Sequence, residues 1–138
     1  MATVSDRKRT KRLGDAVITT GVLHNLLGTY LYRGQLAGMA SDRIIGSASD
    51  ARLGTLEGER RQTALWFFVG GTALVAMGAS IRSAGRDDEP IPAALGPGMT
   101  AIGAIGAATM PFSGFWLIIA EGVAATVLRR RTGERATM

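Results

Sequence analysis

Long apolar segments alternate with short charged segments along the 138 residues of the chain. Each apolar segment is about 20 residues long, which is the length a helix needs to cross a hydrocarbon layer of ~30 Å. A soluble helical protein would instead carry charged residues on the outer face of every helix. We therefore expect an all-α fold, an integral membrane four-helix bundle in an up-down arrangement, with spans at about residues 13–32, 63–81, 91–110 and 112–128.

Basic residues gather at one set of span ends, which predicts the orientation in the membrane. A basic tail of residues 1–12, the segment between the second and third spans, and a basic tail of residues 129–138 carry eleven Lys and Arg. The segment of residues 33–62 carries five arginines, but they are mixed with acidic residues. We therefore expect a multi-pass protein of the plasma (inner) membrane with both termini in the cytoplasm.

The aromatic residues agree with this orientation. On this topology all eight lie toward the outer interface, the depth that Trp and Tyr prefer because the ring is apolar and its N–H or O–H needs a wet partner. These residues are Tyr30, Tyr32, Trp66, Phe67, Phe68, Phe112, Phe115 and Trp116.

The outer segment of residues 33–62 is long for so small a bundle. Ser49 and Asp50 are residue types that cap helices, and they predict a short helix over residues 51–61 in which Glu57 pairs with Arg61. Two interpretations of this segment stay open, a simple connection and a lid.

Glycines recur every seven residues, which is two helical turns, and so mark one face of each predicted helix. Close packing of small residues drives helix association in lipid, because lipid tails are as apolar as the helices. We expect these faces to form the interior of the bundle, with Pro97 marking a kink or a first turn. The repeats are Gly14, Gly21 and Gly28; Gly71 and Gly78; Gly96 and Gly103; and Gly114 with Glu121.

The stretch "GVLHNLLG", residues 21–28, places the only histidine of the chain inside an apolar segment. His24 shares the glycine face, and Asn25 lies at its edge. His24 and Glu121 are at similar depths, roughly 16 Å and 12 Å from the cytoplasmic ends of their spans. Because a buried charge is costly unless it is paired, we expect His24 and Glu121 to meet, with Asn25 or Thr20 as a helper.

Three roles for His24, Asn25 and Glu121 stay open: a structural link between helices, a ligand or substrate site, and a proton site for transport. One histidine and one carboxylate are too few ligands for a metal site.

The remaining composition excludes several classes of protein. The absence of Cys excludes disulfides and thiol chemistry. No nucleophile–base pair or phosphate-binding loop is present, so we expect neither an enzyme nor a cofactor. The basic balance, with a net charge of +5, fits contact with anionic lipid, and no nucleic-acid-binding motif accompanies it.

At "GVLHNLLG" and at "PFSGFWLIIAEG", residues 111–122, the chain resembles small four-span bacterial membrane proteins of unknown function, of a type common in actinobacteria. This resemblance implies a four-helix bundle with a histidine in the first span. More distantly the chain is similar to DoxX-like four-helix membrane proteins, although it has no cysteine and no cofactor motif that would support an oxidoreductase. It also resembles small multidrug transporters, whose glutamate lies in the first span, whereas Glu121 lies in the fourth.

Taken together, these features favour a non-catalytic bundle that acts as an accessory or scaffold subunit, or that binds a small lipophilic ligand near His24 and Glu121. The alternative is a proton-coupled exporter of small molecules that uses Glu121. The expected partners are the lipid bilayer and either a small lipophilic ligand, a membrane protein partner or a second copy of the chain.

Overall fold

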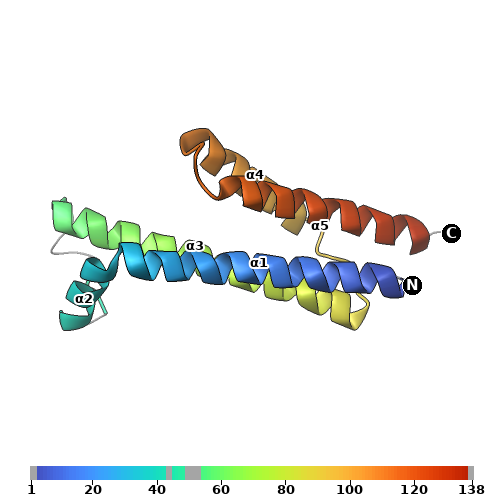
Figure 1. Cartoon of the computed structure of the whole chain (residues 1–138), viewed down its shortest axis with the longest axis horizontal. Coiled ribbons are helices and arrows are strands. Elements are labelled where there is room, and N and C mark those ends of the chain that lie inside the picture. Colours follow the sequence, from blue (N-terminus) through green and yellow to red (C-terminus); the bar gives the residue numbers. More distant parts are fainter. Residues whose placement is uncertain (1–2, 43–44, 49–53, 137–138) are drawn as a thin grey trace. The chain divides into compact units, whose positions relative to one another are not determined.

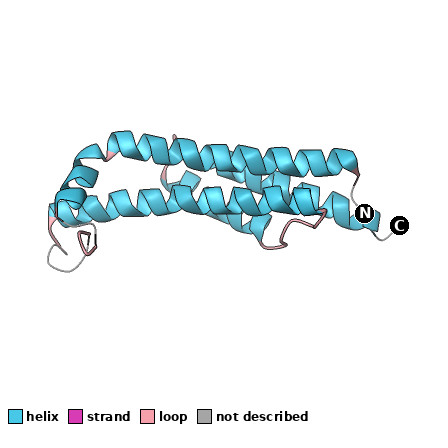
Figure 2. Cartoon of the chain, turned by 90° about the horizontal axis from the view of Figure 1, so that it is seen from below, coloured by secondary structure: helices cyan, strands magenta, loops and turns pink. Residues whose placement is uncertain are grey.

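A computed structural model describes residues 3–42, 45–48 and 54–136 of the chain. These residues form five α-helices and no strand (Figure 1, Figure 2). The fold is therefore all-α, as expected. The helices are α1 (Val4–Leu31), α2 (Arg33–Ser41), α3 (Leu56–Asp87), α4 (Leu95–Thr109) and α5 (Phe115–Ala136).

The chain divides into two compact units. One is made of residues 20–75, and the other of residues 1–19 together with residues 76–138. Helices α1 and α3 each contribute to both units, whereas α2 belongs wholly to the first, and α4 and α5 wholly to the second.

Helix α1 begins at Val4, inside the segment expected to be a basic tail. Thr3 caps it, because the backbone N–H of Asp6 donates to the Thr3 hydroxyl at 3.1 Å, and that hydroxyl donates to the Asp6 carboxylate at 2.7 Å. The Thr3 hydroxyl thus acts as an N-cap, and its own proton binds it to the side chain of Asp6 in the first turn. The charged start of the chain therefore continues the helix that the apolar residues form.

The short helix expected within residues 33–62 lies at Arg33–Ser41, not at residues 51–61. Residues 56–61 are instead the first turns of α3, where the Gly58 N–H donates to the Thr55 hydroxyl at 3.1 Å and so caps the helix. The expected caps, Ser49 and Asp50, lie outside the described residues. The expected ion pair of Glu57 with Arg61 is confirmed, at 2.6 Å.

Helices α1 and α3 touch through glycines, as the spacing predicts. In the unit of residues 20–75, a Cβ on Gly21 would lie 2.7 Å from the carbonyl oxygen of Gly71. In the other unit, a Cβ on Gly78 would lie 2.7 Å from the backbone nitrogen of Ile18 and 2.8 Å from the carbonyl oxygen of Gly14. Each distance is shorter than Cβ atoms tolerate, so these backbones meet only because the side chains are absent.

Helices α4 and α5 pair in the same way within their unit. A Cβ on Gly103 would lie 2.9 Å from the backbone nitrogen of Ile119, and one on Gly122 would lie 2.6 Å from that of Thr100. The expectation for Gly114 is wrong, because it precedes α5 and is exposed, and Gly122 makes the contact instead. Pro97 lies in the first turn of α4, where its missing N–H costs nothing, as expected.

In the described part of the chain, α3 alone has the length and apolar composition of a membrane span, with a mean hydropathy of 1.8 over 18 residues. One helix of this kind is weak evidence for a membrane protein, because the core helix of a soluble protein can have the same length and composition. The other helices fall short for identifiable reasons. Helix α1 carries Asp15, His24 and Asn25, α4 has only 15 residues, and α5 ends in a run of arginines.

Candidate functional site

His24 lies on the face of α1 that packs against α3. The side chain of His24 makes two contacts with α3. Its imidazole stacks on the ring of Phe67, with the ring centroids 3.8 Å apart and an angle of 12° between the planes. Its Nε2 lies 3.1 Å from the carbonyl oxygen of Phe67. Because a carbonyl can only accept, Nε2 must carry the proton of this hydrogen bond. His24 therefore links α1 to α3.

Asn25 makes a second contact with α3. Its Nδ2 donates to the hydroxyl of Thr72 at a long 3.4 Å, and its Oδ1 is buried with no hydrogen-bond donor among the described residues. A Cβ on Gly71 would collide with this Oδ1. The glycine therefore makes the space that the carboxamide occupies.

Two substitutions separate the contributions of His24. We expect His24→Phe to keep the stack on Phe67 and to lower the free energy of unfolding by about 1 kcal/mol through the lost hydrogen bond. His24→Ala removes both contacts and leaves a cavity, so we expect a loss of about 2–3 kcal/mol. Chemical unfolding of the purified protein in detergent measures both values.

The control for this pair is Leu23→Ala, because Leu23 precedes His24 and is exposed. We expect Leu23→Ala to change stability by less than either His24 substitution. A neutral His24→Ala would show that the histidine is not a structural link.

Glu121 lies in α5 with only 5% of its surface exposed. It belongs to the unit of residues 1–19 and 76–138, whereas His24 and Asn25 belong to the unit of residues 20–75. The pairing of His24 with Glu121 therefore stays a prediction. Among the described residues, no group of three His, Asp or Glu side chains could hold a metal ion.

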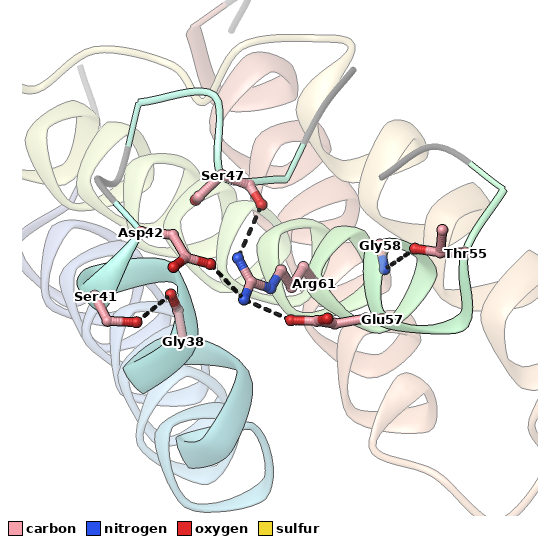
Figure 3. Close-up of polar contacts among 8 residues, drawn as sticks. All are labelled: Gly38, Ser41, Asp42, Ser47, Thr55, Glu57, Gly58 and Arg61. Atoms are coloured by element: carbon pink, nitrogen blue, oxygen red, sulfur yellow. Dashed lines mark hydrogen bonds and ion pairs between the residues drawn. The ribbon is translucent and has the colours of Figure 1, made fainter. Parts of the chain in front are cut away.

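A second polar cluster surrounds Arg61 at the start of α3 (Figure 3). The Arg61 side chain is 4% exposed, and its Nη2 binds the carboxylates of Asp42 at 3.0 Å and Glu57 at 2.6 Å. Its Nη1 donates to the carbonyl oxygen of Ser47 at 3.3 Å. The guanidinium thus joins the end of α2, the segment that follows it and the first turn of α3.

The sequence indicated only part of this cluster. The spacing of Glu57 and Arg61 predicts their ion pair, but the burial of Arg61 and its bond to Asp42, 19 residues away, depend on where α2 folds back. The one sequence feature connected with this contact is the glycine at position 38. A Cβ on Gly38 would lie 2.8 Å from Arg61 Nη2. Gly38 therefore lets the guanidinium approach the backbone of α2.

Comparison with known proteins identifies a family but no characterised relative. No curated protein and no solved structure shows significant similarity to the chain. The model of one family matches residues 8–132, which spans all five helices in whole or in part. The chain therefore belongs to DUF6463, a family of unknown function.

Proposed function

We propose that the chain is a multi-pass protein of the inner membrane, a bundle of four spans with both termini in the cytoplasm, and that it acts as a non-catalytic scaffold or accessory subunit. One observation carries the membrane placement: small residues lie between the helices and large apolar residues point away from them. In α1, Gly14, Gly21 and Gly28 are buried, whereas Leu23, Leu26 and Leu27 are more than half exposed.

The other helices repeat this inverted arrangement. Gly71 and Gly78 of α3 are buried while Leu65, Trp66 and Val69 are exposed, and in α4 Gly103 is buried while Ile102 and Ile105 are exposed. Only 28% of the apolar window of α3 is buried, whereas a core helix of a soluble protein would be mostly buried. Water disfavours so much exposed apolar surface, but lipid tails do not.

The orientation is supported by the charges. Helix α1 begins with a basic segment, and α3 carries Arg82 and Arg86 close to its C-terminal end. Helix α5 carries Arg129, Arg130 and Arg131 in its C-terminal part. These helix ends fall on one side of an up-down bundle, and an excess of Arg and Lys is typical of the cytoplasmic side. The actinobacterial type and the distant relation to DoxX-like proteins belong to this proposal, and they rest on the short motifs around His24 and Gly114.

The scaffold role is supported by the contacts of His24 and Asn25. Both side chains are engaged with α3, through Phe67 and Thr72, which is how polar residues hold membrane helices together. A small lipophilic ligand near His24 and Glu121 is the finer form of this proposal. Such a ligand would have to compete with the contacts that His24 and Asn25 make with α3.

Membrane fractionation and cysteine labelling test the placement, and the natural chain has no cysteine that would interfere. We expect the protein to pellet with membranes after a carbonate wash. We expect Ile45→Cys, at a fully exposed position, to react with an impermeant maleimide in intact cells, and Ser5→Cys to react only after permeabilisation. Recovery in the soluble fraction, or labelling of Ser5→Cys from outside, would contradict the proposal.

A second candidate function is proton-coupled export of small molecules, which is favoured by the burial of the Glu121 carboxylate within a helix. In everted membrane vesicles, an exporter would move ethidium in response to a proton gradient, and Glu121→Gln would abolish this movement. A scaffold would show no gradient-dependent movement, and Glu121→Gln would change its stability alone.

A further inference from the structure

A pocket of about 360 Å³ lies between α2 and the start of α3, within the unit of residues 20–75. We propose that it binds the phosphate group of an amphiphile, the headgroup of an anionic membrane lipid. The volume is at the lower end of the range of small-molecule sites, roughly 300–1,000 Å³. The pocket is lined by Gly34, Gln35 and Gly38 of α2 and by Leu56, Glu57, Arg60 and Arg61 of α3.

The two arginines of the pocket have different roles. The charge of Arg61 faces the carboxylates of Asp42 and Glu57, and its side chain is buried (Figure 3). Arg60 is exposed and makes no hydrogen bond or ion pair with the described residues. A guanidinium presents five N–H donors in a fork that matches the oxygens of a phosphate. Arg61 therefore shapes the wall, and Arg60 is the donor for the anion.

The α2 side of the pocket offers a donor and open space. Gln35 is half-buried, and its amide makes no hydrogen bond among the described residues, so its N–H groups can reach a ligand oxygen. A Cβ on Gly34 would have no atom within 4 Å. The backbone of α2 thus leaves room at this point that a larger residue would fill.

The pocket also has an apolar side, which indicates an amphiphile and not a free anion. Leu56 lines it with 65% of its surface exposed, and α1 ends just before α2 with the exposed residues Tyr30 and Leu31. An exposed tyrosine beside apolar residues is typical of the headgroup depth of a membrane. The lipid as the source of the phosphate rests on the membrane placement proposed above, whereas the phosphate site itself does not.

The carboxylates near the pocket would repel an anion if their charge were not balanced. Glu57 lines the pocket, and Arg61 lies 2.6 Å from its Oε1 and 3.0 Å from Asp42 Oδ2. This arrangement reduces the repulsion at the wall while Arg60 stays accessible. The same ion pairs explain why Arg61 is not itself the binding group.

Native mass spectrometry of the full chain in detergent tests the site, with phosphatidylglycerol as the probe. We expect the wild-type protein to carry a bound phosphatidylglycerol. We expect Gly34→Leu, whose Cβ meets no atom within 4 Å and whose longer side chain takes up space in the pocket, to reduce its affinity about tenfold. We expect Arg60→Gln to do the same through the lost charge-assisted hydrogen bonds. Both variants should unfold at the wild-type temperature.

Gly133→Leu is the matched control, because a Cβ at that glycine of α5 also has nothing within 4 Å. We expect it to bind phosphatidylglycerol like the wild type. Undiminished binding by Gly34→Leu would overturn the site. Equal binding of diacylglycerol, which lacks the phosphate, would overturn the role of Arg60. Displacement of phosphatidylglycerol by an equal concentration of inorganic phosphate would overturn the role of the apolar side of the pocket.

The outcome is separable from that of the membrane placement. A protein that pellets with membranes but binds phosphatidylglycerol regardless of Gly34 and Arg60 overturns the pocket alone. A soluble protein that binds inorganic phosphate through Arg60 overturns the membrane placement and the lipid source together, and the phosphate site is then supported.

Discussion

Gly78→Ala is expected to lower the free energy of unfolding by about 2 kcal/mol, because the added methyl group has no room. Its Cβ would lie 2.7 Å from the backbone nitrogen of Ile18 and 2.8 Å from the carbonyl oxygen of Gly14. Backbone atoms cannot rotate away as the end of a side chain can, so α1 and α3 must separate locally. Overpacking of this kind typically costs about 1–3 kcal/mol. Unfolding of the purified protein in detergent, followed by circular dichroism, measures the loss.

Gly70→Ala is the matched control for this experiment, since it makes the same chemical change in the same helix. Apart from neighbouring residues of α3 itself, the one atom of the described residues within 4 Å of its Cβ is Nε2 of His24, at an ordinary 3.9 Å. Alanine favours a helix over glycine by up to about 1 kcal/mol, so Gly70→Ala should be neutral or stabilising. Because that helix preference is common to both variants, their difference isolates the contact with α1. Equal stability of the two variants would contradict the glycine packing of α1 against α3.

The periodicity of the sequence predicted which glycines face a neighbouring helix, because seven residues are two helical turns in any helix. It could not assign Gly114, which has the right spacing from Glu121 but lies before α5 starts. The capping residues decide such boundaries. Thr3 extends α1 into the charged start of the chain, and Thr55 begins α3 before the apolar segment. Hydropathy alone predicts neither of these helix boundaries.

The candidate site was predicted unevenly for a related reason. The position of His24 on a glycine face follows from helix geometry, and the structure places it against α3. Its contact there is the ring and carbonyl of Phe67. Apolar patterning does not indicate this contact, since by sequence Phe67 is one of eight aromatic residues expected at the same depth. The Arg61 cluster depends on the return of α2 toward α3, and such a contact between distant segments has no local signature.

Arg61→Met is expected to release α2 from α3 and to lower the free energy of unfolding by about 2 kcal/mol. Methionine fills a similar volume but removes the bonds to Asp42, Glu57 and the carbonyl oxygen of Ser47. Breaking a fully buried ion pair costs about 3–5 kcal/mol. The cost here should be smaller, because Asp42 and Glu57 are 38% and 63% exposed and stay hydrated without their partner.

The decisive measurement for Arg61→Met is amide hydrogen exchange in α2, since a helix of nine residues is marginal without tertiary contacts. We expect exchange in Arg33–Ser41 to accelerate at least tenfold, whereas the part of α3 that packs on α1 keeps its protection. Arg60→Met is the control, because it removes the same charge one residue earlier from an exposed side chain that makes no bond to the described residues. It should leave exchange in α2 unchanged. If Arg61→Met and Arg60→Met behave alike, α2 is held by something other than the Arg61 guanidinium, and the wall of the pocket beside it is not fixed in this way.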